Sequence, residues 1–279
     1  MARERIRQTM GFRRARVTGV TRPTPDFVRV TLAGADLADF RADGPADHVK
    51  VYFPNPVTGV LTAPTWSEEH GVERPTDGLV ISRDYTPRAW RPAAEGRPAE
   101  LDIDFFLYEG LGEHGNGPAS SWAAGAAPGG EVAVGGPKGS LLAPAEARHA
   151  LLVADETGLP ALARWIDMLP AGCAITAVVL ASDEATEAYL TAEEEARAGV
   201  EWLYRFDGPG QLEEAVHSID LADDAYVFAA GEAGELLPVR RMLKRDRHVD
   251  ADHLQVQGYW KRGVTNRDHH APIDPSDPD

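Results

Sequence analysis

The sequence predicts two domains, an antiparallel β-barrel followed by an α/β domain with a mostly parallel sheet. A length of 279 residues is sufficient for two domains of common size. Between residues 14 and 139, short apolar or alternating runs are separated by Gly, Pro and Asp, with little helical periodicity. From residue 150 onward, continuous apolar runs alternate with helical patterns, which is typical of βαβ units.

Six runs in the first domain predict strands, because β-prone residues lie between turn residues in each of them. They cover residues 15–20, 27–32, 48–53, 79–85, 101–107 and 131–135. Strands at such spacing favour an antiparallel barrel or sandwich. Residues 117–126 predict a short helix instead, with Pro118 in the first turn, where its missing N–H costs nothing.

The second domain is predicted to contain five strands with helices between them. The strands cover residues 150–154, 175–181, 200–204, 225–230 and 254–258, and the helices 161–169, 185–198, 211–218 and 234–247. We therefore expect a barrel domain over 1–144 and an α/β domain over 145–266. The proline-containing tail, residues 267–279, is expected to be disordered.

Charge and composition exclude several classes of protein. A net charge of −16 argues against nucleic-acid binding, which needs clustered Lys and Arg. Basic residues nevertheless gather between 240 and 267, so a local basic pocket could bind an anionic small ligand. No run approaches the roughly 18 apolar residues of a membrane span. The Arg-rich start lacks a secretory signal, and we expect a cytoplasmic protein that does not bind membranes.

The single cysteine, Cys173, excludes an internal disulfide and a thiolate metal cluster within one chain. It precedes a predicted buried strand, so we expect a structural thiol. No other set of residues predicts a metal site. A monomer is expected, because no heptad repeat or long apolar edge indicates a dimer.

The segment Arg83–Arg88 has the residue types that a flavin requires at the end of a predicted strand. Tyr85 could provide an aromatic wall for the ring, Thr86 a hydroxyl near N5, and Arg83 a cation for the pyrophosphate. A strand end with surface arginines and a half-buried tyrosine would have the same sequence. The motif alone leaves both interpretations open.

A glycine-rich turn leads into the predicted helix at His114-Gly115-Asn116-Gly117-Pro118-Ala119-Ser120. A turn of this kind can present free N–H groups and the positive end of a helix dipole to a diphosphate. Many glycine-rich loops only turn the chain, so this motif too is ambiguous by itself.

Taken in order, the motifs resemble those of the siderophore-interacting proteins, a family of FAD-dependent ferric-siderophore reductases. The shared motifs are Arg-x-Tyr-Thr-x-Arg, Asp-x-Asp-Phe, His-Gly-x-Gly-Pro-Ala-x-x-Trp, Gly-Pro-Lys-Gly, Asp-Glu-Thr-Gly-Leu-Pro-Ala, Ala-Gly-Glu-Ala and Gly-Tyr-Trp-Lys-Arg-Gly. The resemblance covers about residues 12–265. It implies an FAD-binding barrel followed by a nucleotide-binding domain of the ferredoxin-reductase type.

The resemblance also assigns the FAD-binding residues. They are Arg83, Tyr85, Thr86, Asp102, Asp104, Phe105, His114, Gly117, Ala119 and Ser120. The segment Tyr108–Glu113 lengthens the usual family spacing, so either His114 keeps the role of the family histidine or Tyr108 takes it. We favour His114. No side chain is expected to act as a catalytic acid, base or nucleophile, because the flavin carries the chemistry.

Nicotinamide binding is implied in the second domain. The residues concerned are Asp155, Glu156, Thr157, Gly231, Glu232 and Ala233. The turn after the second strand is Ser182-Asp183-Glu184, which slightly favours NADH, since a 2′-phosphate needs a basic neighbour. Arg205 or a C-terminal arginine could supply that neighbour by folding back. A domain that had lost nicotinamide binding and only packs would keep the same segments.

Three basic residues, Lys50, Arg245 and Lys261, are candidates for holding an anionic ferric siderophore. For Lys50 and Lys261 the assignment follows from the family motifs, and solvated side chains are the alternative. The expected activity is FAD-dependent transfer of electrons to Fe(III), with release of Fe(II). The electron donor is NAD(P)H, with ferredoxin as the alternative. The alternatives are a flavin oxidoreductase with another acceptor and a non-catalytic flavoprotein that binds siderophores.

Overall fold

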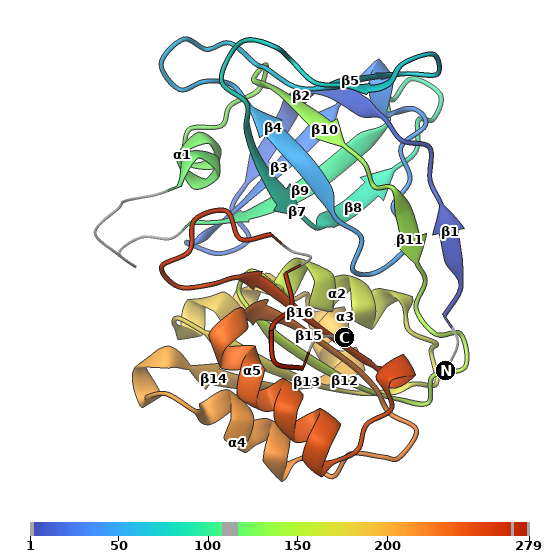
Figure 1. The fold of residues 1–279 in the computed structure, drawn as a ribbon, viewed down its shortest axis with the longest axis vertical. Helices are drawn as coiled ribbons and strands as arrows, with labels where there is room; N and C mark the ends of the chain where they lie inside the picture. The colour runs from blue at the N-terminus through green and yellow to red at the C-terminus, as the bar shows by residue number, and fades with distance from the viewer. Residues whose placement is uncertain (1–2, 108–116, 269–270, 278–279) are drawn as a thin grey trace. The chain divides into compact units, whose positions relative to one another are not determined.

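The computed structural model describes residues 3–107, 117–268 and 271–277. The chain divides into two compact units (Figure 1). The barrel unit comprises Arg5–Leu142, and the α/β unit comprises Ala143–Asp279 together with Met1–Glu4. Each unit has a hydrophobic core of its own.

The barrel unit is built on one antiparallel sheet of seven strands. In sheet order they are β7 (Ile81–Tyr85), β4 (Val49–Phe53), β10 (Glu131–Gly135), β2 (Phe12–Thr21), β3 (Phe27–Ala33), β9 (Glu100–Phe106) and β8 (Pro87–Arg91). The two edges, β7 and β8, are separated in sequence by Thr86 alone. The sheet therefore curves until its edges meet, and we call this junction the seam.

Side chains alternate between the two faces of this sheet, as the period of a strand requires. On β9, Leu101, Ile103 and Phe105 are buried in the core, whereas Asp102 and Asp104 lie on the other face. The short helix α1 (Pro118–Ala124) begins at its proline and buries Ala119 and Ala123 against the core.

Two small sheets accompany the barrel strands. β1 (Arg5–Arg7) pairs with β11 (Gly139–Leu141), and β5 (Thr65–Ser67) forms a hairpin with β6 (Gly71–Glu73). These strands were not predicted, because each has only three residues. Runs of that length carry no periodicity that a sequence pattern can detect.

The α/β unit contains a parallel sheet of five strands. In sheet order these are β14 (Ala198–Tyr204), β13 (Ala174–Ala181), β12 (His149–Asp155), β15 (Tyr226–Glu232) and β16 (Leu254–Trp260). The strand order reverses between β12 and β15. Ligands of open α/β sheets bind beyond the carboxyl ends of the strands at such a switch point.

Helices cover both faces of the parallel sheet (Figure 1). The helix α2 (Leu159–Met168) buries Trp165 against Tyr226 and Phe228 of β15. The alternate residues of β15 contribute to the core formed with α4 (Gln211–Ser218) and α5 (Ala233–Arg241). A π-helical turn, Met242–Asp246, extends α5.

The predicted acidic helix over 185–198 is divided into two parts. A 3₁₀ turn, Glu184–Tyr189, is followed by α3 (Ala192–Arg197). The division arises at Thr191, which has an extended backbone and forms a capping box with Glu194. The capping box starts a new helix, because each side chain satisfies a backbone N–H of the other residue.

The C-terminal segment differs from the disorder that its composition predicts. Its described residues lie along α5, with Ile273 packed against the core of the α/β unit. Asp274 accepts a hydrogen bond from Arg241 Nε at 2.7 Å, and Asp277 accepts one from Lys244 Nζ at 2.8 Å. No helix of the described chain is long and apolar enough to cross a membrane.

Candidate functional site

Three residues at or beside the seam, Arg83, Tyr85 and Thr86, form the first candidate site. Arg83 and Tyr85 lie on the core-facing side of β7, because their register partners on β4 are the buried Val51 and Val49. Thr86 is buried where the two edges of the sheet meet. Pairing in this sheet therefore places all three predicted flavin residues within one short stretch at the barrel's closure.

An aromatic cluster backs Tyr85. Its ring centroid is 4.5 Å from that of Phe105 and 6.4 Å from that of Phe53. Trp122 of α1 packs on the same group, 5.6 Å from Phe105. Burial raises the pKa of Tyr85, so its hydroxyl remains neutral over the physiological range. The cluster gives a rigid apolar wall, which suits a flat conjugated ring.

The polar atoms at the seam are left available, and this fits the requirements of a flavin. Within residues 3–107, 117–268 and 271–277, the hydroxyls of Tyr85 and Thr86 form no hydrogen bond, and Arg83 donates only to the adjacent Ser82 carbonyl, at 2.7 Å. By contrast, Arg29 and Arg91 are paired with carboxylates of β9. Buried polar groups normally have partners, so the unpaired set is consistent with a bound polar cofactor such as FAD.

Asp102 and Asp104 are placed differently from the seam residues. Asp102 accepts hydrogen bonds from Arg91 at 2.7 Å and from Thr31 at 2.8 Å, and Asp104 pairs with Arg29 at 2.7 Å. Both carboxylates lie on the face of β9 opposite Phe105. These contacts support a role in holding the sheet, and contact of either carboxylate with FAD stays a prediction.

The predicted diphosphate segment is described only from residue 117 onward. Gly117 precedes α1, and no described atom lies within 4 Å of the position that a Cβ on it would take. Ala119 is buried, and Ser120 donates to the Phe106 carbonyl at 3.3 Å. His114 and Tyr108 lie outside the described residues. That His114 rather than Tyr108 has the role of the family histidine therefore stays a prediction.

The predicted nicotinamide residues meet at the switch point of the α/β unit. Asp155, at the end of β12, accepts hydrogen bonds from the Thr157 amide at 2.8 Å and the Glu232 amide at 2.9 Å. Glycine is required at two positions for this contact. A Cβ at position 158 would lie 2.4 Å from Ala230 O, and a Cβ at position 231 would lie 2.7 Å from Asp155 Cγ. These hydrogen bonds join the Asp-Glu-Thr-Gly motif, residues 155–158, to the Ala-Gly-Glu-Ala motif, residues 230–233.

The carboxylates at the switch point have internal functions. Glu232 caps α5, accepting from the Glu235 amide at 2.8 Å, and also accepts from the Arg262 amide at 2.9 Å. Ala233 is the first residue of that helix and is buried. A nicotinamide site formed by these residues would therefore use their backbone and their shape, and it stays a prediction.

Glu156 is buried at the same edge and forms hydrogen bonds with Ser182 and Arg205. Burial, together with the neighbouring charge of Asp155, raises the pKa of Glu156, whereas Arg205 opposes the shift. Arg205 Nη1 also lies 2.5 Å from Glu235 Oε1. One guanidinium thus lies within 4 Å of three carboxylates, those of Asp155, Glu156 and Glu235.

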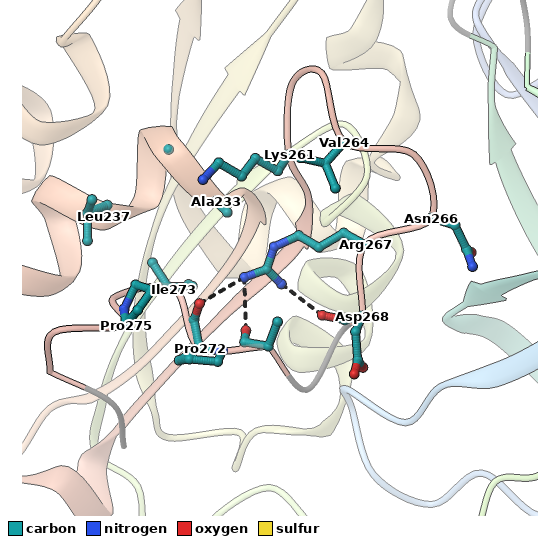
Figure 2. A pocket seen from close by; sticks show the side chains of 12 residues that line it. Ala233, Leu237, Lys261, Val264, Asn266, Arg267, Asp268, Pro272, Ile273 and Pro275 are labelled. Atoms are coloured by element: carbon teal, nitrogen blue, oxygen red, sulfur yellow. Dashed lines mark hydrogen bonds between the residues drawn. The ribbon is translucent and has the colours of Figure 1, made fainter.

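The three candidate substrate cations have different surroundings. Lys50 pairs with Asp84 at 2.7 Å on the face of β4 opposite Tyr85. Arg245 lies 3.5 Å from Asp277. Lys261 forms no ion pair with any described residue, and Figure 2 shows it beside a cavity of about 360 Å³.

Two of these cations lie near different ends of α5. The Lys261 cavity is lined by Gly234 at the start of α5, whereas Arg245 lies in the π-helical turn beyond its end. At 1.5 Å per residue, eleven residues of helix span roughly 16 Å. Arg245 is not among the residues that line the Lys261 cavity, although its partner Asp274 lies between two that are, Ile273 and Pro275.

Sequence reasoning did not assign some residues that complete these sites. Trp260 donates from Nε1 to Asp155 Oδ2 at 2.7 Å, and Arg205 pairs with Glu156 just beyond β12 and with Glu235 in the first turn of α5. Trp260 lies in the recognised Gly-Tyr-Trp-Lys-Arg-Gly motif, which was the available signal. For Phe53 no signal existed, because its contact with Tyr85 depends on the pairing of β4 with β7.

Comparison with known proteins gives matches to both units. A family model described as "Siderophore-interacting FAD-binding domain" matches residues 16–141. A second, described as "Siderophore-interacting protein", matches residues 147–263. The two models together span nearly all of the described chain.

Three individual proteins are similar over most of their length. The chain is 32% identical to the NADPH-dependent ferric-chelate reductase of Escherichia coli, covering 92% of this chain and 96% of that protein. It is 30% identical to the ferric vibriobactin reductase ViuB of Vibrio cholerae, covering 88% of each. A siderophore utilization protein from T. fusca has a solved structure that aligns with a TM-score of 0.83 at 40% identity, covering 97% of this chain and all of that one.

Proposed function

This chain belongs to the siderophore-interacting protein family, and on that premise we propose that it is an FAD-dependent reductase of ferric siderophores. Electrons pass from NAD(P)H to Fe(III), and the reduced iron is released for assimilation. The names of the E. coli and V. cholerae relatives, both reductases of ferric chelates, support this activity.

The observation that carries the proposal is the unpaired polar set at the seam. Tyr85 with its aromatic backing would lie against the flavin ring, and the Thr86 hydroxyl would donate to a ring nitrogen. Arg83 would bind the pyrophosphate, because its guanidinium has no carboxylate partner among the described residues. Bound FAD supplies the link between a two-electron donor and a one-electron acceptor.

The protein's own contribution is binding and orientation. Reduction itself releases the metal, because hard oxygen ligands hold Fe(II) less tightly than Fe(III). No general acid is required, and Asp155 and Glu232 are already occupied as hydrogen-bond acceptors for backbone amides. The α/β unit would hold NAD(P)H at the switch point between β12 and β15.

The siderophore would be held by charge. Lys261 is available beside its cavity, and Lys50 could exchange Asp84 for an anionic ligand. Arg245 is the weakest of the three candidates, because Asp274 and Asp277 both lie within 3.7 Å of it. A monomeric state, a cytoplasmic location and the use of ferredoxin remain predictions.

A direct experiment supplies the FAD-loaded protein, without oxygen, with NADH, NADPH or reduced ferredoxin and a ferric siderophore. A colorimetric Fe(II) chelator then measures product. We expect Fe(II) with at least one donor. Arg83→Ala should weaken FAD binding about tenfold or more, because a charge-assisted contact to the pyrophosphate is lost. Arg16→Ala removes a surface arginine paired with Glu131 and serves as the matched control.

The Lys261 assignment has its own test. Lys261→Ala should raise KM for an anionic tris-catecholate complex several-fold and leave KM for a neutral ferric hydroxamate unchanged. An equal effect on both complexes would remove the docking role. Reduced flavin that persists in the presence of every ferric siderophore would instead favour another acceptor, and absence of reduction by any donor would favour a binding protein.

A further inference from the structure

We propose that residues 271–277, here called the strap, are autoinhibitory: they close one wall of the Lys261 cavity, and their carboxylates pair with cations that an anionic ferric siderophore would otherwise bind. The inference rests on the proposed function, since it presumes that Lys261 holds an anionic ferric complex. It adds a means of regulating that site. It also accounts for Arg245, an expected siderophore ligand that is paired with carboxylates of the strap.

The strap forms one wall of the Lys261 cavity, and the first half of α5 and the segment after β16 form the rest (Figure 2). With the strap in place the cavity measures about 360 Å³. That value is near the lower end of the roughly 300–1,000 Å³ typical of pockets for drug-sized ligands. A hexadentate ferric complex, in which three bidentate arms surround the metal, is larger than such a ligand. The closed cavity therefore takes one arm of the complex, and the whole complex requires the strap to move. The lining residues of the strap are Ala271, Pro272, Ile273 and Pro275.

The start of the strap is held through its backbone and one apolar side chain. Arg267 Nη2 donates to the carbonyls of Ala271 at 2.9 Å and Pro272 at 3.1 Å, and its Nη1 donates to the Gly258 carbonyl of β16 at 3.0 Å. Ile273 packs against the core of the α/β unit. The start of the strap is therefore its fixed end.

The rest of the strap is held by charge. Asp274 Oδ2 lies 2.7 Å from Arg241 Nε and 3.7 Å from Arg245 Nη2, and Asp277 Oδ1 lies 2.8 Å from Lys244 Nζ. The hydrogen bond from Arg241 lowers the pKa of Asp274, and the one from Lys244 lowers the pKa of Asp277. Both carboxylates are therefore charged at neutral pH and act as an internal anionic ligand for these cations.

The ion pairs of the strap are suited to exchange with an external anion. The side chains of Arg241 and Arg245 are 43% and 52% exposed, and exposed ion pairs contribute little to stability. Asp274 lies between Ile273 and Pro275, which both line the cavity, so its cations border the space that opens when the strap moves. A ferric tris-catecholate carries a higher negative charge than either carboxylate. The complex and the strap therefore compete for the same cations.

Calorimetric titration of the FAD-loaded chain with the gallium(III) complex of a tris-catecholate siderophore tests the strap. Ga(III) accepts no electron from flavin, so binding is measured without turnover. We expect Asp274→Asn combined with Asp277→Asn to bind the complex about tenfold more tightly than the wild type, because a larger fraction of chains has an open cavity. Asp277→Asn alone should bind it about threefold more tightly.

The matched control combines Asp220→Asn with Asp223→Asn. Both residues are exposed in the same unit, so this variant removes the same charge elsewhere and should change the affinity less than twofold. Lys261→Ala should weaken binding by a larger factor in the double variant of the strap than in the wild type, since the whole complex reaches Lys261 only when the strap has moved.

A synthetic peptide with the sequence of residues 271–277 gives a test in trans. At millimolar concentration it should compete with the gallium complex for the double variant of the strap, because a tethered segment has an effective concentration of that order. The same peptide with Asn in place of both Asp residues should not compete.

Three results would overturn the inference: equal affinity of the wild type and the double variant of the strap, an equal effect of Lys261→Ala in both, or no binding by either. None of them depends on reduction. A chain that reduces ferric siderophores but gives any of these results keeps the proposed function and loses the autoinhibitory strap. A chain whose double variant binds more tightly as expected, but which never releases Fe(II), loses the proposed function and keeps the strap.

Discussion

At the scale of single residues, alternation along a strand separates the side chains predicted to bind flavin from those that form ion pairs across the sheet. On β7, Arg83 and Tyr85 share the core-facing side of the strand, whereas Asp84 faces the other way and pairs with Lys50. On β9, Phe105 packs against Tyr85, whereas Asp102 pairs with Arg91 on the opposite face. One residue of displacement thus decides whether a side chain reaches the seam.

The pairing of Asp102 with Arg91 predicts that Asp102→Asn lowers the free energy of unfolding by an amount that depends on pH. Burial alone would raise the pKa of Asp102, but hydrogen bonds from Arg91 and Thr31 lower it below its ordinary value. A lowered pKa means that the carboxylate stabilises the fold at neutral pH and that this contribution is lost as the pH falls through the folded-state pKa. We expect the variant to lose about 2 kcal/mol at pH 7 and less in acid.

Urea unfolding at several pH values measures this effect. Glu131→Gln, which removes a pair with Arg16 at the surface, should change the free energy of unfolding by less than about 0.5 kcal/mol and is the control. FAD titration of the Asp102 variant decides its second role. Unchanged FAD affinity assigns Asp102 to the sheet, and a large loss of affinity assigns it to the cofactor.

For Glu156 we expect the opposite dependence of stability on pH. Its pKa is raised by burial and by Asp155, so the protonated form is favoured in the folded chain. The resulting stability is present below the unfolded-state pKa and is lost as the pH rises through the folded-state value. Melting temperatures should therefore show wild type losing stability relative to Glu156→Gln from acidic to neutral pH. A difference that is constant with pH would contradict this.

At the scale of elements, the sequence predicts the bounds of helices and strands well where those bounds do not depend on long-range strand pairing. Residues 131–135 and 211–218 have the predicted bounds, because turn residues flank each of them. β8 was missed, since it begins with Pro87, which suits only the first residue or the edge of a strand. The break at Thr191 was readable as a capping box, whereas the aromatic wall behind Tyr85 required the sheet register.

Ion pairs hold the C-terminal segment against α5. Asp274 and Asp277 pair with basic residues of α5 and its π-helical turn, and these pairs lower the pKa of both carboxyls. Replacing both with Asn should therefore speed hydrogen exchange of α5 amides, with no change in β12 and β13. Equal exchange in both proteins would show that Ile273 alone holds the segment.

At the scale of the whole molecule, two independent cores place two kinds of site at predictable points. The barrel has its predicted flavin residues at the seam where its edges close, and the parallel sheet has its predicted nicotinamide motifs at the switch point. Motif order in the sequence led to both candidate sites, whose roles in binding a cofactor stay predictions. It could not predict which polar groups stay unpaired, because that depends on the position of every neighbouring side chain.

Anaerobic stopped-flow absorbance of the FAD-loaded protein tests the central claim most directly. One equivalent of NAD(P)H should bleach the flavin band, and an excess of ferric siderophore should restore it, with about two Fe(II) captured per NAD(P)H oxidised. A chain that cannot take up FAD, or whose bleached flavin persists when ferric siderophore is added, would contradict it.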